Sequence, residues 1–259
     1  MTASNQTHPI TWRQPSDEPV VVVSQIDEPV LTLTGVRYLP HPQPVDNHLT
    51  CRIAVLLPGA GGTYQAEGLD VLARTFAKAG IDTLVTNLPH NELRRPPANM
   101  TRNVAVFSQL VNTFIGLANP HNDRPCQVIV GGKSYGARVA FTYAAAASPV
   151  HLAGVVAYGF PLHPPGKTVR RDTMFADLGL PGLFIQGSRD PFGSSAELAD
   201  ALHGFGGAAT FVSITGGNHD GAVTKQHAPD GVKRTPQAAL HDHADTFARW
   251  ATHATATTT

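Results

Sequence analysis

Three side chains that together can perform nucleophilic catalysis follow strand-like segments of this chain: a serine, an aspartate and a histidine. Ser134 has one glycine two residues before it, Gly132, and another two residues after it, Gly136. An apolar segment precedes this turn and a segment rich in small residues follows it, as is typical of a nucleophilic serine on a sharp strand-to-helix turn. The glycine spacing alone is a weak signal for a nucleophilic serine, because an ordinary strand–helix turn can have the same spacing. The strand-like segment before it and the helix-like segment after it favour the nucleophile.

A serine hydroxyl needs a base within hydrogen-bond reach, and the base needs an acid that orients it. Asp190 follows a predicted strand that ends at Gln186, and His219 follows the next predicted strand, which ends at Ile214. The alternatives are that Asp190 only opens a turn or caps a helix, and that His219 is an ordinary loop histidine. Asp220 is a weaker candidate for the acid, because neighbours in sequence rarely face each other.

Acyl transfer passes through an oxyanion, which backbone N–H groups stabilise. We expect one donor from Tyr135, the residue after the serine, and the other from Ala60 in the glycine-rich loop 59–62, with Gly61 as second choice. A phosphate-binding loop would need a lysine before the Ser or Thr that opens the helix, and a dinucleotide site would need the G-x-G-x-x-G spacing. The loop 59–62 meets neither requirement, since Gly62-Thr63-Tyr64-Gln65 lacks the lysine and the glycine spacing is different.

Six apolar segments predict the strands that must position these residues, and helical patterns separate them. The strands are predicted over 51–57, 81–88, 126–131, 153–158, 182–186 and 209–214, and helices over 67–79, 99–117, 194–202 and 236–250, with a loop over 89–97. The alternation predicts a parallel sheet with helices on both faces, whose ligands bind at the carboxyl ends of the strands. Upstream, 19–24 and 30–38 predict an antiparallel pair of strands, followed by a proline-rich linker over 39–47.

The 259 residues, 42% of them hydrophobic, are consistent with one domain over 18–250, with flexible segments at 1–17 and 251–259. Nineteen basic residues balance nineteen acidic ones, so we expect neither nucleic acid nor a membrane as a partner. Two cysteines are too few for a disulfide framework, and residues 1–5 lack the pattern of a signal peptide. We therefore expect a cytoplasmic protein.

The histidines and cysteines do not form a metal-binding pattern. His241 and His243 are two residues apart on a predicted helix and point to different faces, and there is no Cys-x-x-Cys. We predict no metal and no cofactor. No pattern in the sequence indicates an oligomeric state.

Four segments carry a family resemblance: 56–62, 131–140, 159–167 and 186–193. On these residues the chain resembles the α/β-hydrolase superfamily, in which the order Ser, Asp, His is expected. More narrowly it resembles the bacterial proteins grouped with testis-expressed protein 30 and subunit 3 of the NSL complex, with the Pro-Leu-His-Pro-Pro-Gly loop at 161–166 as the most specific part. Dienelactone hydrolases are a looser likeness, because their nucleophile is a cysteine. The resemblance spans about 51–250 and implies an α/β-hydrolase fold there; the predicted N-terminal antiparallel strands lie outside the part it covers well. Since about 20 residues separate two strands where a lid usually lies, we expect no large lid.

The sequence departs from the narrower family at Lys133, where arginine is usual, and at Asn218, where an acidic residue is usual. In the hydrolase sheet the strands that begin near Cys51 and Cys126 are neighbours, and matched strand ends would place the two thiols close together. The sequence favours two small core residues over a disulfide.

Cationic side chains gather in loops at or near the predicted catalytic edge: Arg94, Arg95, Lys133, Lys167, Arg170 and Arg171. They suggest a substrate with a carboxylate or phosphate, and the alternative is a solvated loop surface. Arg94, Arg95, Lys133 and His163 are the candidate substrate-binding residues.

The function predicted from these patterns is a serine hydrolase that cleaves a small or medium ester or thioester, a small-molecule acyl substrate, through an acyl-enzyme. The alternative is a non-catalytic binding or scaffold protein on the same fold, since some members of the narrower family are subunits of protein complexes.

Overall fold

The computed structural model describes residues 20–21, 24–25, 32–40, 51–121, 125–146 and 151–256. Within them, eight strands form one sheet: β1 (Val20–Val21), β4 (Gly35–Tyr38), β5 (Cys51–Leu57), β6 (Asp82–Thr86), β7 (Cys126–Lys133), β8 (Leu152–Tyr158), β9 (Gly182–Gly187) and β10 (Ala209–Ile214). Two more strands, β2 (Ser24–Gln25) and β3 (Thr32–Leu33), form a separate antiparallel pair.

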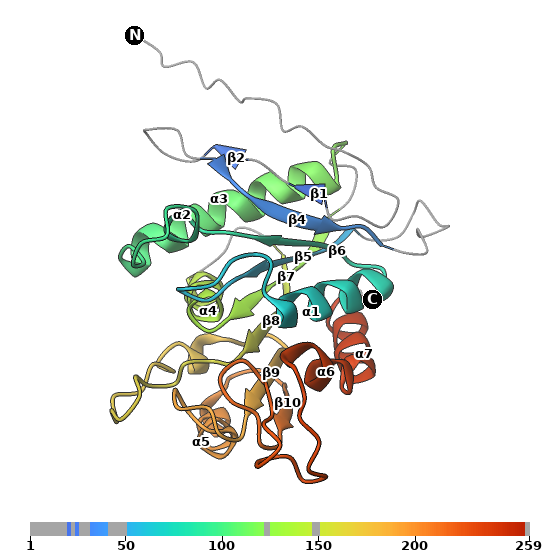
Figure 1. Cartoon of the computed structure of the whole chain (residues 1–259). Helices are drawn as coiled ribbons and strands as arrows, with labels where there is room; N and C mark the ends of the chain where they lie inside the picture. The colour runs from blue at the N-terminus through green and yellow to red at the C-terminus, as the bar shows by residue number, and fades with distance from the viewer. Residues whose placement is uncertain are drawn as a thin grey trace.

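The order across the sheet is β1-β4-β6-β5-β7-β8-β9-β10 (Figure 1). All pairings from β6 to β10 are parallel, while β4 pairs antiparallel with β6 and β1 with β4. The helices are α1 (Glu67–Lys78), α2 (Pro89–Glu92), α3 (Met100–Ala118), α4 (Tyr135–Ala145), α5 (Ser195–Ala201), α6 (Pro236–His241) and α7 (Ala244–Ala254). The predicted fold class, an α/β-hydrolase fold with antiparallel strands at its N-terminal side, is confirmed.

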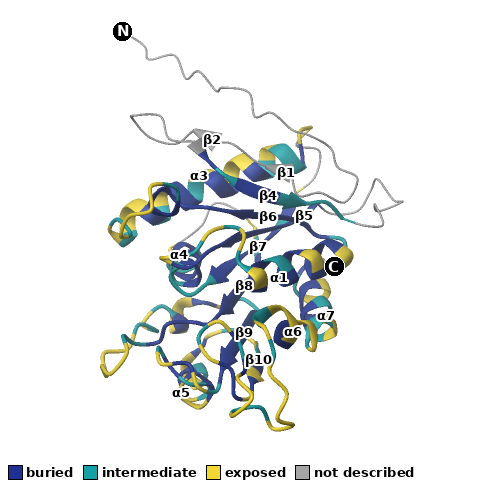
Figure 2. Ribbon diagram, viewed as in Figure 1, coloured by how far each residue is buried: buried dark blue, intermediate teal, exposed yellow. Residues whose placement is uncertain are grey.

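The core lies in two layers because successive side chains of a strand point to opposite faces of the sheet. Val55 of β5 packs in one apolar cluster with Phe107 of α3, whereas its neighbour Leu56 packs in the other with Phe76 of α1 and Trp250 of α7. In Figure 2 the central strands are buried along almost their whole length, and the exposed residues lie on the outer sides of the helices and in the loops. Burial on both faces is why these strands are apolar almost throughout.

The sequence-based prediction is wrong in two segments. Over 89–97, predicted as a loop, the structure has the short helix α2, which is too short to produce a helical period in the sequence. The last helix is interrupted between α6 and α7 and runs to Ala254, so the predicted flexible tail 251–259 begins too early. Ala251 is buried, and the hydroxyl of Thr255 donates to its carbonyl at 2.8 Å. The predicted segment 1–17, most of the linker 39–47 and residues 257–259 lie outside the described residues.

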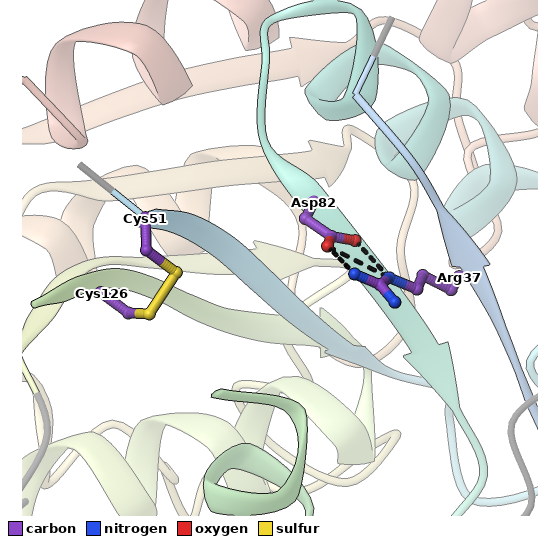
Figure 3. Close-up of a disulfide and its surroundings, with 4 residues drawn as sticks. All are labelled: Arg37, Cys51, Asp82 and Cys126. Atoms are coloured by element: carbon purple, nitrogen blue, oxygen red, sulfur yellow. Dashed lines mark hydrogen bonds and ion pairs between the residues drawn. A yellow bond between two sulfur atoms is a disulfide. The ribbon is translucent and has the colours of Figure 1, made fainter. Parts of the chain in front are cut away.

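At the amino ends of the central strands, Cys51 and Cys126 are register partners on β5 and β7 and form a disulfide (Figure 3). This corrects the preference for two free core thiols, and the cysteines no longer support the expected cytoplasmic location. Near it, the Nε of Arg37 on β4 donates to both carboxylate oxygens of Asp82 on β6, at 2.9 and 3.1 Å. Burial raises the pKa of Asp82, and the ion pair with Arg37 opposes that rise.

The segment between β8 and β9, where a lid would be inserted, contains a single 3-10 turn at Phe175–Asp177. No lid domain is present there within the described chain. Among the described residues, none of the helices has the length and apolar character that a membrane span requires.

Candidate active site

Ser134 forms the turn between β7 and α4 with a strained backbone, at φ 51° and ψ −117°. The glycines on either side are required by the close approach of β5. A Cβ on Gly132 would lie 2.2 Å from the carbonyl oxygen of Leu57, and one on Gly136 would lie 2.5 Å from the same atom. The neighbouring strand therefore holds the turn in a conformation that exposes the hydroxyl at the carboxyl edge of the sheet.

The structure brings Ser134, His219 and Asp190 into one hydrogen-bonded chain. The Nε2 atom of His219 lies 2.9 Å from the Oγ atom of Ser134, and its Nδ1 atom lies 2.8 Å from Oδ2 of Asp190. The Asp190 side chain is inaccessible to solvent, whereas that of His219 is 19% exposed. Asp220, the weaker candidate for the acid, instead forms an ion pair with Lys133.

Neighbouring backbone and side-chain groups hold Asp190 and His219 in place. The backbone N–H of Phe192 donates to Oδ1 of Asp190 at 2.8 Å, and the side-chain amide of Gln186 donates to Oδ2 at 3.0 Å. The Phe192 ring packs on the His219 ring, with centroids 4.4 Å apart. Gly159, at φ 61°, packs closely against His219, and a Cβ on this glycine would lie 2.9 Å from the carbonyl oxygen of His219. With these donors the buried carboxylate is held in one orientation, and it fixes the orientation of the imidazole ring.

The glycine-rich loop after β5 lies against the serine, since a Cβ on Gly59 would be 3.4 Å from the Cβ of Ser134. Asn91 of α2 fixes this loop by donating to the carbonyl oxygens of Gly59 and Gly62, at 2.9 Å each. In a trans peptide the C=O and N–H groups point in opposite directions, so the N–H of Ala60 points away from Asn91. Asn91 could not be recognised as a site residue from the sequence, because α2 is too short to produce a helical pattern.

Both predicted oxyanion donors border the same cavity as Ser134. In the described part of the chain, neither the N–H of Ala60 nor that of Tyr135 donates to a protein acceptor. The cavity has a volume of about 480 Å³ and is lined by Gly59, Ala60, Gly61, Gly62, Ala66, Lys133, Ser134, Tyr135, Arg138, Pro161, Arg171, Phe192, His219 and Asp220. A larger hollow of about 810 Å³ between α1, α6 and α7 shares none of these residues, so Ser134 and His219 border the smaller cavity and not the larger one.

The predicted substrate-binding residues divide into two groups. Lys133 lines the cavity, whereas Arg94 and Arg95 are exposed and lie outside its lining. His163 also lies outside, with its Nε2 atom 3.3 Å from Oε1 of Glu197. The candidate set is therefore only partly brought together by the fold.

The cavity also contains a cation that the sequence analysis did not single out, Arg138. It lies four residues after Ser134 on α4, and a helix places residues i and i+4 on the same face. That spacing from the serine was the signal in the sequence that could have found it.

Asp220 and Lys133 neutralise each other at the rim of the cavity. Burial by itself would raise the pKa of Asp220, but the hydrogen bond and charge of Lys133, together with the charge of His219, outweigh burial and lower it. The Lys133 ammonium also lies over the Tyr158 ring, 5.9 Å from its centroid. This cation is therefore already partnered within the protein.

Residues 51–252 match the family model described as an alpha/beta hydrolase domain. Among solved structures, the chain is similar to an alpha-beta serine hydrolase homologue from Coxiella burnetii, with a TM-score of 0.65 and 16% identity over 92% of this chain and 98% of that one. It is also similar to a dienelactone hydrolase from Anabaena variabilis, with a TM-score of 0.62 and 19% identity over 90% and 96% of the two chains.

A third similar structure is a serine hydrolase without a lid from Xanthomonas campestris, with a TM-score of 0.58 and 17% identity over 95% of this chain and 96% of that one. The search of curated proteins gave no match. At these sequence identities the structural similarity shows the fold alone. The matches do not confirm the predicted resemblance to the group of testis-expressed protein 30. The match over most of the chain shows that the protein belongs to the alpha/beta hydrolase domain family.

Proposed function

We propose that the protein is a serine hydrolase that cleaves a small or medium ester or thioester through an acyl-enzyme intermediate. The observation that carries this proposal is the hydrogen-bonded chain from Ser134 through His219 to Asp190, at 2.9 and 2.8 Å, which opens into a cavity. These three groups, in this order and at these distances, are what a hydroxyl needs to become a nucleophile at neutral pH.

In the acylation step the Oγ atom of Ser134 attacks the carbonyl carbon of the substrate while its proton passes to Nε2 of His219. The N–H groups of Ala60 and Tyr135 donate to the oxyanion that forms. As the tetrahedral intermediate collapses, the imidazolium gives its proton to the leaving alcohol or thiol. Asp190 keeps its negative charge throughout and stabilises the charged ring through Nδ1–H.

In the deacylation step a water molecule takes the place of the leaving group. His219 accepts a proton from the water as its oxygen attacks the acyl carbon, and a second tetrahedral intermediate forms in the same oxyanion site. Collapse of this intermediate breaks the bond to Oγ, returns the proton to Ser134 and releases the acid. The absence of a lid between β8 and β9 in the described chain leaves the cavity open for this exchange.

The size of the cavity supports a small or medium substrate. A volume of about 480 Å³ lies in the usual range for small-molecule sites. The neighbours named as a dienelactone hydrolase and as serine hydrolases support the reaction class, while the choice of substrate depends on this chain's own residues.

The competing proposal, a non-catalytic scaffold, comes from the narrower resemblance, and one experiment separates the two. A fluorophosphonate probe should label the wild-type protein and fail to label Ser134→Ala, because the probe reacts only with an activated serine. Ser194→Ala is the matched control, since Ser194 caps α5 and its loss should leave labelling intact. A folded wild-type protein that takes no label would overturn the hydrolase proposal. A panel of p-nitrophenyl esters of different chain length then defines the acyl group.

A further inference from the structure

Two arginines that line the Ser134 cavity have no anionic partner among the residues that the structure describes. Neither the guanidinium of Arg138 nor that of Arg171 makes a hydrogen bond or an ion pair with another side chain in the described residues. The Nε atom of Arg138 is buried without any hydrogen-bond partner. A buried polar donor without a partner is costly, and a charged one is more so.

The two arginines come from elements that the fold holds in place. Arg138 lies one helical turn beyond Ser134 on α4, roughly 6 Å along the axis, and its N–H donates to the Ser134 carbonyl at 3.2 Å. Its guanidinium lies 6.0 Å from the centroid of the Tyr135 ring. Arg171 belongs to the segment between β8 and β9, and its N–H donates to the carbonyl of Leu162 at 2.8 Å.

The two charges are close enough to act on each other. Burial lowers the pKa of Arg138, and the positive charge of Arg171 lowers it further. Two like charges at a partly buried site repel, and an anion bound between them would relieve both the repulsion and the missing hydrogen bond.

The other charges at the cavity do not compete for this role. Lys133 and Asp220 pair with each other at the rim, and Asp190 is buried against His219. The residue before Arg171 in the loop, Arg170, lies outside the cavity lining and pairs with the carboxylates of Asp172 and Asp200. The net charge left inside the cavity is therefore that of Arg138 and Arg171.

We propose that Arg138 and Arg171 form an anion-binding subsite that makes the protein specific for an ester or thioester carrying a carboxylate or phosphate group. This inference rests on the proposed function, whose substrate class it names. The distance of one helical turn from Ser134 places the anion a few bonds from the scissile carbonyl, as in a half-ester of a short dicarboxylic acid. Two guanidinium groups suit such a group because each presents parallel N–H donors to its oxygens.

The test compares mono-p-nitrophenyl glutarate with p-nitrophenyl valerate, a neutral ester of the same chain length, at constant ionic strength. The ratio of kcat/KM for the anionic ester to that for the neutral ester should fall about ten- to hundredfold in Arg138→Met and in Arg171→Met, because each loses a hydrogen bond to a charged group. Methionine keeps most of the side-chain volume. Arg171→Lys should recover part of the ratio, and Arg170→Met, the matched control, should keep the wild-type ratio. An unchanged ratio in both cavity variants would refute the subsite.

Two further arms make the result independent of turnover and identify the anion. Calorimetric titration of Ser134→Ala with monomethyl glutarate should give binding at least about tenfold tighter than with methyl valerate, and Arg138→Met should abolish the difference. Equal affinities would overturn the subsite even if the protein hydrolysed no ester. Inhibition by glutarate that exceeds inhibition by inorganic phosphate identifies the carboxylate, and the reverse order identifies the phosphate. If the fluorophosphonate probe labels Ser134 but both ratios stay at the wild-type value, the hydrolase proposal stands and this one fails.

Discussion

The two neighbouring strands β5 and β7 end very differently at the two edges of the sheet. At their amino ends they are joined by the Cys51–Cys126 disulfide, and the ion pair between Arg37 and Asp82 lies close by (Figure 3). At their carboxyl ends they carry the strained turn at Ser134 and a glycine-rich loop in which Ala60 and Gly61 are exposed. One edge is cross-linked and charge-paired, and the other is strained and open, with Arg138 and Arg171 lacking an ion-pair partner within the described chain.

This difference has a topological cause. In a parallel sheet all the carboxyl ends lie at one edge, so the loops that can hold a ligand gather there and the amino ends are free to stabilise the fold. Strain and unsatisfied charge at a functional edge lower stability and need compensation elsewhere. Substitutions at the two edges should therefore change different quantities.

The largest effect is expected for Ser134. Ser134→Ala should lower kcat/KM for a p-nitrophenyl ester by roughly 10⁴-fold or more, because the nucleophile is lost. Ser134→Gly should be as inactive but more stable than Ser134→Ala, by roughly 1 kcal/mol, since glycine adopts φ 51° without strain. Ester assays and thermal melts of both variants measure this. A glycine variant that melts below the alanine variant would contradict the strain argument.

At the opposite edge, loss of the disulfide should change stability and leave activity intact. The Cys51→Ala/Cys126→Ala double variant should lose about 4 kcal/mol of the free energy of unfolding, from closure of a loop whose ends are 75 residues apart. Its kcat/KM at 25 °C should equal that of the wild type. Denaturant titration measures the change in stability, and a thiol assay without reductant tests the disulfide itself. Two reactive thiols in the unfolded, unreduced wild type would show that the bond is absent.

A positioning residue at the carboxyl edge should give a smaller effect on catalysis. Asn91→Ala removes both hydrogen bonds to the glycine loop, so the N–H of Ala60 loses its fixed direction and kcat should fall roughly ten- to hundredfold with little change in KM. The matched control is Asn99→Ala, which removes the cap of α3, at a cost of about 1 kcal/mol in stability, and should keep the wild-type kcat. Equal kcat values in the two variants would exclude a positioning role for Asn91.

The smallest effect concerns His90, which is buried at the same edge against the Tyr135 ring with both ring nitrogens unpaired. Burial lowers its pKa, and the charge of Arg95 lowers it further. The unfolded chain then takes up a proton that the folded chain does not, so this residue's contribution to stability is present above about pH 6.5 and is lost as the pH falls below it. The melting temperature should drop less between pH 7.5 and 5.0 in His90→Phe than in the wild type. Parallel curves for the two proteins would contradict this assignment.

Much of the fold could be predicted from the sequence because its signals are local. The apolar runs of the buried strands, the helical spacing of α1 and the glycines around Ser134 each depend on a few neighbouring residues. Parallel topology then places the segments after β7, β9 and β10 at one edge, which is why Ser134, Asp190 and His219 could be proposed together. The helix α2 could not be predicted, because it is too short to produce a helical periodicity in the sequence. The end of α7 could not be predicted either, because it depends on the burial of Ala251.

Tertiary structure alone decided which charges face the cavity and which thiols are joined. Arg170 and Arg171 are adjacent in sequence, yet one pairs with surface carboxylates and the other lines the site, because the direction of a side chain in a loop depends on what the backbone packs against. The spacing of Arg138 from Ser134 places both residues on one side of α4, but only the packing around α4 decides that this side borders the cavity. The sequence determined where a hydroxyl, an imidazole and a carboxylate could meet, and the packing of loops and strands determined the cations around them and the bond between Cys51 and Cys126.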